Sequence, residues 1–233
     1  MRFSRHPLAL LLSSNIATAF VIRNIPRSRQ FTTAAITTHA NSNNKSNNSN
    51  SNNSLTTTTS MKAVAAKVAL CQFPVGHDKA VNHQTASSYL TRAAEQGATL
   101  AVLPEIWNGP YATAAFADYA EVLPSVGATI GDCNDLSLKS SPSVKLLQDH
   151  AQKLKMTIVG GSIPEIDGGK IYNTCLVFDK SGTVVAKHRK VHLFDIDVPG
   201  GIRFKESDTL SPGDAVTAFD GGDEFGMIGI GIW

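Results

Sequence analysis

The sequence predicts an α/β domain built from layers, with a mixed β-sheet at its centre. From Lys62 onward, short apolar runs alternate with longer segments whose apolar residues recur at helical spacing. Further along, two strand-like runs flank Asp179-Lys180-Ser181-Gly182, a turn sequence typical of a β-hairpin. Parallel strands need crossover helices and a hairpin joins antiparallel strands, so we expect both kinds of pairing.

Two helices are expected. The first spans Lys79–Gln96 before Gly97, which can end it, and its apolar residues lie mostly on one face: Val81, Tyr89, Leu90, Ala93 and Ala94. The second begins at Ser143, where Ser after Pro142 is a start signal. Its apolar residues at helical spacing are Val144, Leu147, Ala151 and Leu154.

The strands are expected between and after these helices. Each is a short apolar run bounded by turn residues or by a predicted helix. Before the second helix, Ser125–Ser141 shows no period and is interpreted as a polar surface loop. The expected strands are Val64–Phe73, Thr99–Leu103, Thr157–Gly160, Ile171–Phe178, Thr183–His188 and Met227–Ile232.

Residues 1–60 are expected to lie outside the fold. A short apolar run from Pro7 follows two arginines and ends in Ala17-Thr18-Ala19, as a signal peptide does, and Phe20 follows the expected cut. Val21 to Ala40 is rich in Arg, Ser and Thr and has no acidic residue, which is typical of a transit peptide. This layout resembles two-part plastid presequences. A mitochondrial presequence is the alternative, and we place the plastid first by a narrow margin.

An Asn/Ser/Thr tract over Asn41–Ser60 completes this region and predicts a disordered linker, because it has few apolar side chains to bury. Met61 then stands directly before the domain, residues 61–233, and could start a cytosolic form. With a net charge of +2 in 233 residues, and with the basic excess at the N-terminus, the sequence gives no indication of a nucleic-acid partner. We also expect no membrane span.

Three charged residues could carry chemistry. Glu105 follows the expected strand Thr99–Leu103 after Pro104, at the edge where α/β sheets bind ligands, and partial burial there would raise its pKa toward use as a base. Lys190 precedes an apolar stretch, so it could point inward and stabilise an oxyanion if a carboxylate pairs with it. Glu206 is a second candidate carboxylate. Taken alone, each residue is more often simply part of an exposed loop or a solvated sheet edge.

The three cysteines lack the setting of a nucleophile. Cys71 and Cys175 lie inside expected strands and are interpreted as core, and Cys133 lies in the polar loop with no adjacent base. No Cys/His spacing typical of a metal site is present, nor a Gly-x-Ser-x-Gly or phosphate-binding loop. His192 has no evident partner, and a hydrogen-bonding role is the simpler interpretation.

Several segments together resemble the nitrilase, or carbon–nitrogen hydrolase, superfamily, and most closely its omega-amidase (Nit2-like) branch. The resemblance covers the chain from about residue 66 to its end. One matching run is Arg189–Gly200, and its most specific part is His-Leu-Phe-Asp-Ile-Asp-Val-Pro-Gly, residues 192–200. The other matching segments are Leu103-Pro104-Glu105, Gly160–Glu165, Tyr172-Asn173-Thr174 and Leu210–Asp214.

The resemblance implies a four-layer αββα sandwich, incomplete in this chain, and hydrolysis of an amide through a thioester. It implies Glu105 as general base, Lys190 as the group that stabilises the oxyanion and Glu206 as the glutamate that positions substrate and lysine. The expected substrates are small omega-amides, 2-oxoglutaramate or 2-oxosuccinamate, which yield the dicarboxylate and ammonia in nitrogen and glutamine metabolism. The resemblance implies no cofactor and no metal, and a homodimer for the full-length protein.

One position departs from the family pattern. The family strand reads Gly-Ile-Cys-Tyr-Asp, whereas here Gly231-Ile232 is followed by Trp233. With Trp233 in place of the nucleophilic cysteine, we expect this chain to be inactive. The alternatives are a catalytically inactive fragment that binds a partner or a homologue, a deaminated-glutathione amidase, and a gene-model error at an intron.

Overall fold

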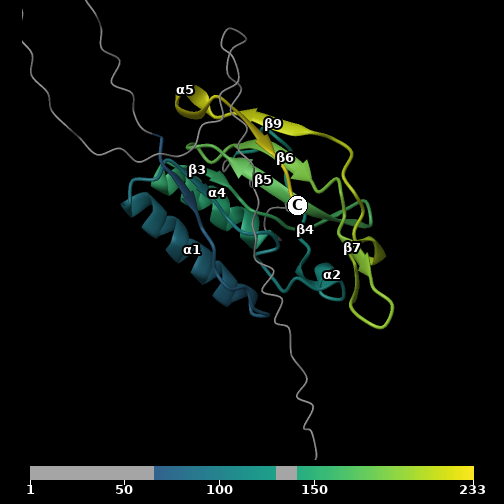
Figure 1. Cartoon of the computed structure of the whole chain (residues 1–233). Helices are drawn as coiled ribbons and strands as arrows, with labels where there is room; N and C mark the ends of the chain where they lie inside the picture. Colours follow the sequence, from purple (N-terminus) through teal and green to yellow (C-terminus); the bar gives the residue numbers. More distant parts are fainter. Residues whose placement is uncertain (1–65, 130–140) are drawn as a thin grey trace, which may run out of the picture.

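The structure is a computed structural model that describes residues 66–129 and 141–233 (Figure 1). The expected presequence, the linker, Met61 and Cys133 lie outside these residues. Within them, six strands form the main sheet, in the order β1-β2-β3-β5-β4, with β6 pairing β5. The strands are β1 Val68–Leu70, β2 Leu100–Val102, β3 Thr157–Val159, β4 Ile163–Asp167, β5 Lys170–Phe178 and β6 Val184–Arg189.

The sheet is mixed, as the sequence predicts. β2 pairs in parallel with β1 and with β3, whereas β5 pairs antiparallel with β3, β4 and β6. In the turn between β5 and β6, Asp179 Oδ1 accepts hydrogen bonds from the backbone N–H groups of Ser181 and Thr183. Gly182 takes φ +84° there, which a side chain would disfavour. The predicted hairpin is therefore confirmed, with its turn chemistry.

Two helices, α1 (Lys79–Glu95) and α4 (Pro142–Leu154), cover one face of the sheet (Figure 1). α1 begins after Asp78, whose carboxylate caps the backbone N–H groups of Ala80 and Val81. The apolar core beneath the helices includes Leu90 and Ala93 from α1, Leu147 and Ala151 from α4, and Ile158 and Leu176 from the sheet. None of the helices in the described ranges has the length and apolar character needed to cross a membrane.

A second hairpin and a short helix cover the opposite face. The hairpin pairs β9 (Thr217–Asp220) with β10 (Met227–Ile230), and α5 (Gly222–Phe225) connects them. The core on this face is formed by Leu100, Val102, Val159, Cys175, Val177, Ala186, Phe219, Phe225, Ile228 and Ile230. Apolar strands covered on both faces account for the almost continuous apolar runs in β2 and β3.

Some expectations are wrong in detail. The first strand is shorter than predicted and is an edge strand, so Val68 and Leu70 remain 41% and 70% exposed. Val81 is exposed on α1, where Asn82 is buried instead and exchanges hydrogen bonds with the backbone of Gly76. α4 begins at Pro142, and Ser143 is a buried side chain whose hydroxyl donates to Glu121.

Several elements had no periodic signal. The short helix α2 (Phe116–Tyr119) packs near β4, and β7 (Asp195–Asp197) pairs with β8 (Arg203–Lys205) as a projecting hairpin. A single 3-10 turn, Glu206–Asp208, follows β8. Each of these elements contains three or four residues, which is too short for a helical or a strand repeat of apolar residues to be recognised in the sequence.

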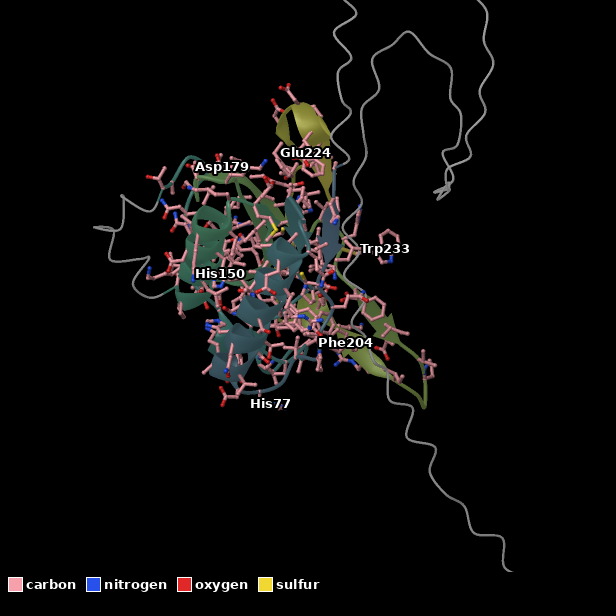
Figure 2. The ribbon with its side chains drawn as sticks, turned by 90° about the vertical axis from the view of Figure 1, so that its left-hand side faces the viewer. His77, His150, Asp179, Phe204, Glu224 and Trp233 are labelled. Atoms are coloured by element: carbon pink, nitrogen blue, oxygen red, sulfur yellow. The ribbon has the colours of Figure 1, made fainter. Side chains whose placement is uncertain are left out.

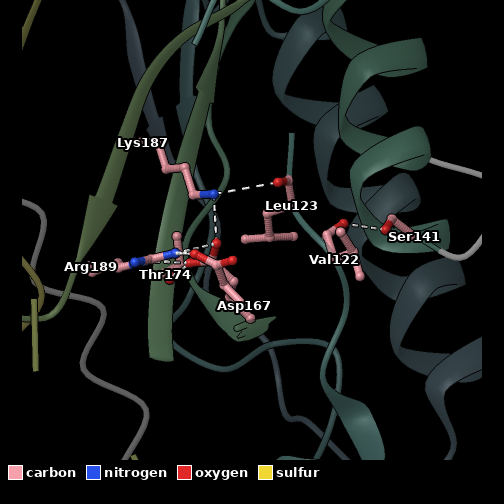
Figure 3. Close-up of polar contacts among 8 residues, drawn as sticks. Val122, Leu123, Ser141, Asp167, Thr174, Lys187 and Arg189 are labelled. Carbon is pink, nitrogen blue, oxygen red and sulfur yellow. Dashed lines mark hydrogen bonds and ion pairs between the residues drawn. The ribbon is translucent and has the colours of Figure 1, made fainter. Parts of the chain in front are cut away.

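An ion cluster around the buried Glu165 links β4, β5 and β6 (Figure 3). Glu165 is buried, and its carboxylate pairs with Lys187 and receives two hydrogen bonds of 2.8 Å from Arg189. Thr174 donates to the same carboxylate at 2.7 Å. Burial by itself would raise the pKa of Glu165, but the hydrogen bonds from Arg189, Lys187 and Thr174 outweigh it and hold that pKa below its usual range.

The turn after β3 packs directly against the turn after β2. Gly161 has φ +60°, and a Cβ atom there would lie 2.0 Å from the carbonyl oxygen of Pro104. Ser162 donates its N–H to that same carbonyl at 3.1 Å. The absence of a side chain at Gly161 therefore allows the two turns to touch, and one of them carries Glu105.

We predict that Gly161→Ala destabilises the protein far more than Gly168→Ala. Gly168 has a similar φ of +56° but open space around the added methyl group, so it should cost only the left-handed backbone penalty, about 1–2 kcal/mol. Gly161→Ala adds overpacking against backbone atoms, about 1–3 kcal/mol more. Urea unfolding of both variants measures the difference, and equal stabilities would contradict the packing argument.

We predict that Glu165→Gln lowers the free energy of unfolding by about 3–5 kcal/mol, because it leaves the Lys187 and Arg189 charges without their buried partner. Asp167→Asn is the matched control. Asp167 is exposed and contacts the same Arg189, so its loss should matter far less. Thermal and urea unfolding measure both variants. A Glu165→Gln protein as stable as Asp167→Asn would show that the cluster does not hold the three strands.

Candidate active site

Lys190 lies at the end of β6, buried at 1% exposure. Its backbone is fixed on both sides, because its N–H donates to the carbonyl of Asn173 and its own carbonyl accepts from Gly213 N–H, each at 2.8 Å. Its Nζ lies 2.9 Å from Glu105 Oε1 and 3.0 Å from Glu206 Oε2. The structure therefore brings together the three residues that the sequence predicts for the site, and Lys190 does point inward.

Glu206 is fully buried, contrary to the exposed-loop alternative. It follows β8 directly, where the backbone turns into the 3-10 helix, and the N–H of Glu206 donates to Phe194 O. Its Oε1 accepts from Tyr111 Oη at 2.7 Å and from Lys190 Nζ at 3.1 Å, and its Oε2 accepts from Phe194 N–H at 2.6 Å. Both carboxylate oxygens are thus occupied by donors.

Glu105 follows β2, at the edge of the sheet where the sequence places it. The next residue, Ile106, has φ +47°, which is an outlier for a β-branched side chain. Ser162 supports this bend, since Ser162 Oγ accepts from Ile106 N–H at 3.0 Å and its carbonyl accepts from Trp107 N–H at 3.2 Å. The strained turn directs the Glu105 carboxylate back toward Lys190.

The two carboxylates differ in how many of their oxygens are engaged. Glu105 Oε1 accepts from Lys190 Nζ and from Asn173 Nδ2, at 2.9 and 2.8 Å. Its Oε2 has no hydrogen-bond partner among the described residues. Burial raises the pKa of Glu105, with the Glu206 charge adding to the rise and Lys190 and Asn173 opposing it. A carboxylate with a raised pKa and a free oxygen is suited to accept a proton.

Two further residues touch the site and were not predicted. Tyr111 stacks on Phe204, at 5.4 Å between ring centroids, and donates to Glu206. Burial and the two nearby carboxylates raise the pKa of Tyr111, so its hydroxyl remains a donor. Asn173 donates to Glu105 from β5. In the sequence, Asn173 stands out only within the Tyr172-Asn173-Thr174 motif, and no local pattern indicates Tyr111.

A pocket opens beside these groups, between the sheet and the end of the chain. It is lined by Leu103, Glu105, Ser162, Cys175, and Ile230 to Trp233. Trp233 is 84% exposed, and its side chain projects from the ribbon (Figure 2). The residue that the sequence places at the nucleophile position therefore lines the same pocket as Glu105.

The two cysteines in the described part of the chain, Cys71 and Cys175, are poorly suited to act as nucleophiles. Burial raises the pKa of Cys71 to about 11 and that of Cys175 to about 12, so both stay protonated at neutral pH. Both are buried, as the sequence predicts, although Cys71 lies one residue beyond β1. His192 is exposed, and in the described part of the chain its side chain makes no hydrogen bond. Over the same residues, no group of three or more His, Cys, Asp or Glu side chains could hold a metal ion.

Known proteins share this sequence and this fold. The chain is 46% identical over 165 residues to an omega-amidase, chloroplastic, of Arabidopsis thaliana. This alignment covers 71% of this chain and 41% of that protein. It is 45% identical over 166 residues to omega-amidase NIT2-A of Xenopus laevis, with 71% and 54% covered. The chain thus spans about half the length of the curated relatives that it matches.

A solved structure and a family model agree with this match. The crystal structure of Saccharomyces cerevisiae Nit3, a member of branch 10 of the nitrilase superfamily, superposes with a TM-score of 0.56 at 39% identity. The alignment covers 70% of this chain and 53% of that one. The model of the carbon-nitrogen hydrolase family matches residues 67–232, which include the whole cluster around Lys190. With its mixed sheet, its pocket and these matches, the chain belongs to the carbon-nitrogen hydrolase family.

Proposed function

We propose that the protein is an amide hydrolase of the omega-amidase type, which converts 2-oxoglutaramate or 2-oxosuccinamate to the dicarboxylate and ammonia. The observation that carries the proposal is Lys190, buried between Glu105 and Glu206, with Glu105 lining a pocket. The similarity to omega-amidases of Arabidopsis thaliana and Xenopus laevis supports the substrate class. Because the chain spans about half the length of these relatives, the proposal concerns the whole protein.

The proposed roles follow from the hydrogen bonds. Glu105 is the general base, because its Oε2 is free to take a proton from a cysteine thiol. Lys190 has three N–H donors, and pairing with Glu105 and Glu206 leaves one for the oxyanion of the tetrahedral intermediate. Glu206 holds the lysine and does not act as base, since Tyr111, Phe194 and Lys190 occupy its oxygens.

The proposed reaction has two halves. The thiolate attacks the amide carbon, forming a C–S bond, and Glu105 returns its proton to the nitrogen as the C–N bond breaks and ammonia leaves. Glu105 then takes a proton from water, whose oxygen attacks the thioester. The C–S bond breaks and the acid is released, and Glu105 returns its proton to the sulfur, which restores the thiol and the free carboxylate. The scheme uses no metal and no organic cofactor.

We propose that Trp233 stands at the position of the nucleophile. The supporting observations are the Gly231-Ile232 sequence before it and its place beside Glu105 in the pocket. An indole ring cannot form a thioester, so a chain with Trp233 lacks the covalent step. This specific observation also supports the second candidate function, a catalytically inactive chain that binds a partner or an active homologue.

For the complete protein we propose a four-layer αββα sandwich that forms a homodimer. The support is the described architecture, in which α1 and α4 cover one face of the mixed sheet and a β-hairpin covers the other. We also propose that residues 1–60 direct the protein to a plastid, with the mitochondrion as the alternative and a cytosolic form from Met61. The chloroplastic omega-amidase of Arabidopsis thaliana supports the plastid.

The activity can be tested with a chimera. In it, cysteine replaces Trp233 and the C-terminal part of the Xenopus laevis omega-amidase follows. We expect ammonia release from 2-oxoglutaramate by the chimera and none by the chain that keeps Trp233. Glu105→Gln should lower kcat/KM by roughly a hundred- to ten-thousand-fold, the usual contribution of a general base.

Two controls make this experiment decisive. Glu165→Gln removes a buried glutamate that pairs with cations outside the pocket, so its kcat/KM per folded enzyme should stay near that of the chimera. Deaminated glutathione, tested beside 2-oxoglutaramate, separates the two amidase types. If the folded chimera hydrolysed neither amide, the proposed function would be wrong. Binding of the Trp233 chain to an active homologue would then favour the second candidate.

The pH profile should follow Glu105. Only the carboxylate form of Glu105 can accept a proton, and burial raises the pKa of this group. We therefore expect kcat/KM to reach its plateau value above that raised pKa and to fall as the pH drops through it. This fall should occur at a higher pH than an exposed glutamate would produce. Rates of ammonia release at a series of acid pH values measure this fall, the acid limb of the pH profile. A profile that keeps its shape in Glu105→Gln would exclude Glu105 as the titrating group.

A further inference from the structure

Asn173 lies on β5 with its side chain fully buried. Alternation along the strand places it on the same face as Cys175 and Val177, and Cys175 lines the pocket, while Thr174 lies on the opposite face. Its Nδ2 donates to Glu105 Oε1 at 2.8 Å, and its main-chain carbonyl accepts from Lys190 N–H at 2.8 Å. One residue thus contacts both the proposed base and the backbone of the proposed oxyanion-stabilising lysine.

These contacts make the two oxygens of Glu105 different from each other. Oε1 receives donors from both Asn173 and Lys190, whereas Oε2 meets no donor from any residue that the structure describes. Glu105 also lines the pocket. A proton arriving from the pocket would therefore bind Oε2, because protonating Oε1 would displace one of its two donors.

Asn173 makes its contact at a cost. Its Oδ1 is buried and has no hydrogen-bond partner among the described residues. A buried unpartnered carbonyl destabilises the fold, and an apolar side chain would avoid this loss. The hydrogen bond from Asn173 Nδ2 to Glu105 accounts for an amide at this buried position, where its Oδ1 has no partner among the described residues.

We infer that Asn173 is a positioning residue for Glu105, which holds Oε1 and thereby leaves Oε2 as the oxygen that accepts the proton. The catalytic consequence of this inference, proton transfer to Oε2, rests on the proposed function. The hydrogen bond between Asn173 and Glu105 does not. In the step concerned, the S–H bond of a cysteine thiol breaks, its electron pair stays on sulfur, and an O–H bond forms at Oε2. Without Asn173, the carboxylate loses a donor that favours its charged form and can rotate about its last bond.

NMR titration of the Glu105 carboxyl group in the whole chain tests the inference without any turnover. In Asn173→Ala, the midpoint should move upward, because the lost N–H bond had stabilised the carboxylate. Asn173→Asp should move it further upward, because it places a second negative charge beside Glu105. A Glu105 midpoint unchanged in both folded variants would overturn the inference.

Asn108 provides a matched control. It too is a fully buried asparagine whose Oδ1 lacks a partner in the described part of the chain, and its Nδ2 lies 3.5 Å from the buried carboxylate of Glu121. Asn108→Ala should therefore lower the melting temperature much as Asn173→Ala does, and leave the Glu105 midpoint in place. An equal shift in both variants would reduce the role of Asn173 to general support of the fold.

A measurement on the unsubstituted chain covers the case in which the Asn173 variants fail to fold. The side-chain amide resonances of Asn173 should titrate with the same midpoint as Glu105 and should stop titrating in Glu105→Gln. Those of Asn108 should not follow Glu105. Asn173 resonances that are insensitive to the ionisation of Glu105 would overturn the inference.

In the chimera, the same role predicts a shift of the acid limb. Asn173→Ala should move the limb of kcat/KM to higher pH and recover its rate above the limb, with KM there unchanged, whereas a structural defect would lower the rate at every pH. A limb that stays in place while the rate falls uniformly would count against positioning. If the chimera releases no ammonia at all, the proposed function fails, and the NMR titration still decides the role of Asn173.

Discussion

The burial of the Lys190 ammonium group is the constraint on which the site depends. A buried cation is costly unless carboxylates compensate it, and Glu105 and Glu206 do so from two different turns. The end of β6 fixes the lysine backbone, the bend at Ile106 aims one carboxylate and the turn after β8 aims the other. Two carboxylates around one ammonium leave a net negative charge in a partly desolvated place, which favours the binding of a proton there.

The proton has a preferred destination because the two carboxylates are unequally bonded. Glu206 has donors on both oxygens, and protonating it would break contacts to Tyr111, Phe194 N–H or Lys190. Glu105 has its donors on one oxygen, so the other can be protonated without such a loss. The hydrogen bonds therefore support the proposed division of roles on grounds that do not depend on the family resemblance.

The sequence predicted the parts of the fold that have a clear period or turn chemistry. The span of α1, the β5–β6 hairpin and the mixed sheet are confirmed, and so is the inward direction of Lys190. The exposure of Val81 and the burial of Asn82 were missed because a helical face does not reveal which polar side chain finds a backbone partner. The burial of Glu206 depends on Tyr111 and Lys190, which are distant in sequence, so no local pattern could indicate it.

The charged groups of the site and Trp233, at the proposed nucleophile position, are held by different contacts in this structure. Glu105, Lys190, Glu206 and Asn173 bond to one another and to the backbone of the sheet and its loops, whereas the Trp233 side chain is 84% exposed and donates no hydrogen bond to the described residues. None of the hydrogen bonds and ion pairs given above for these charged groups involves the Trp233 side chain. A change there would therefore alter reactivity while leaving the surrounding electrostatics intact, since the position of the base and the lysine is set by contacts made elsewhere.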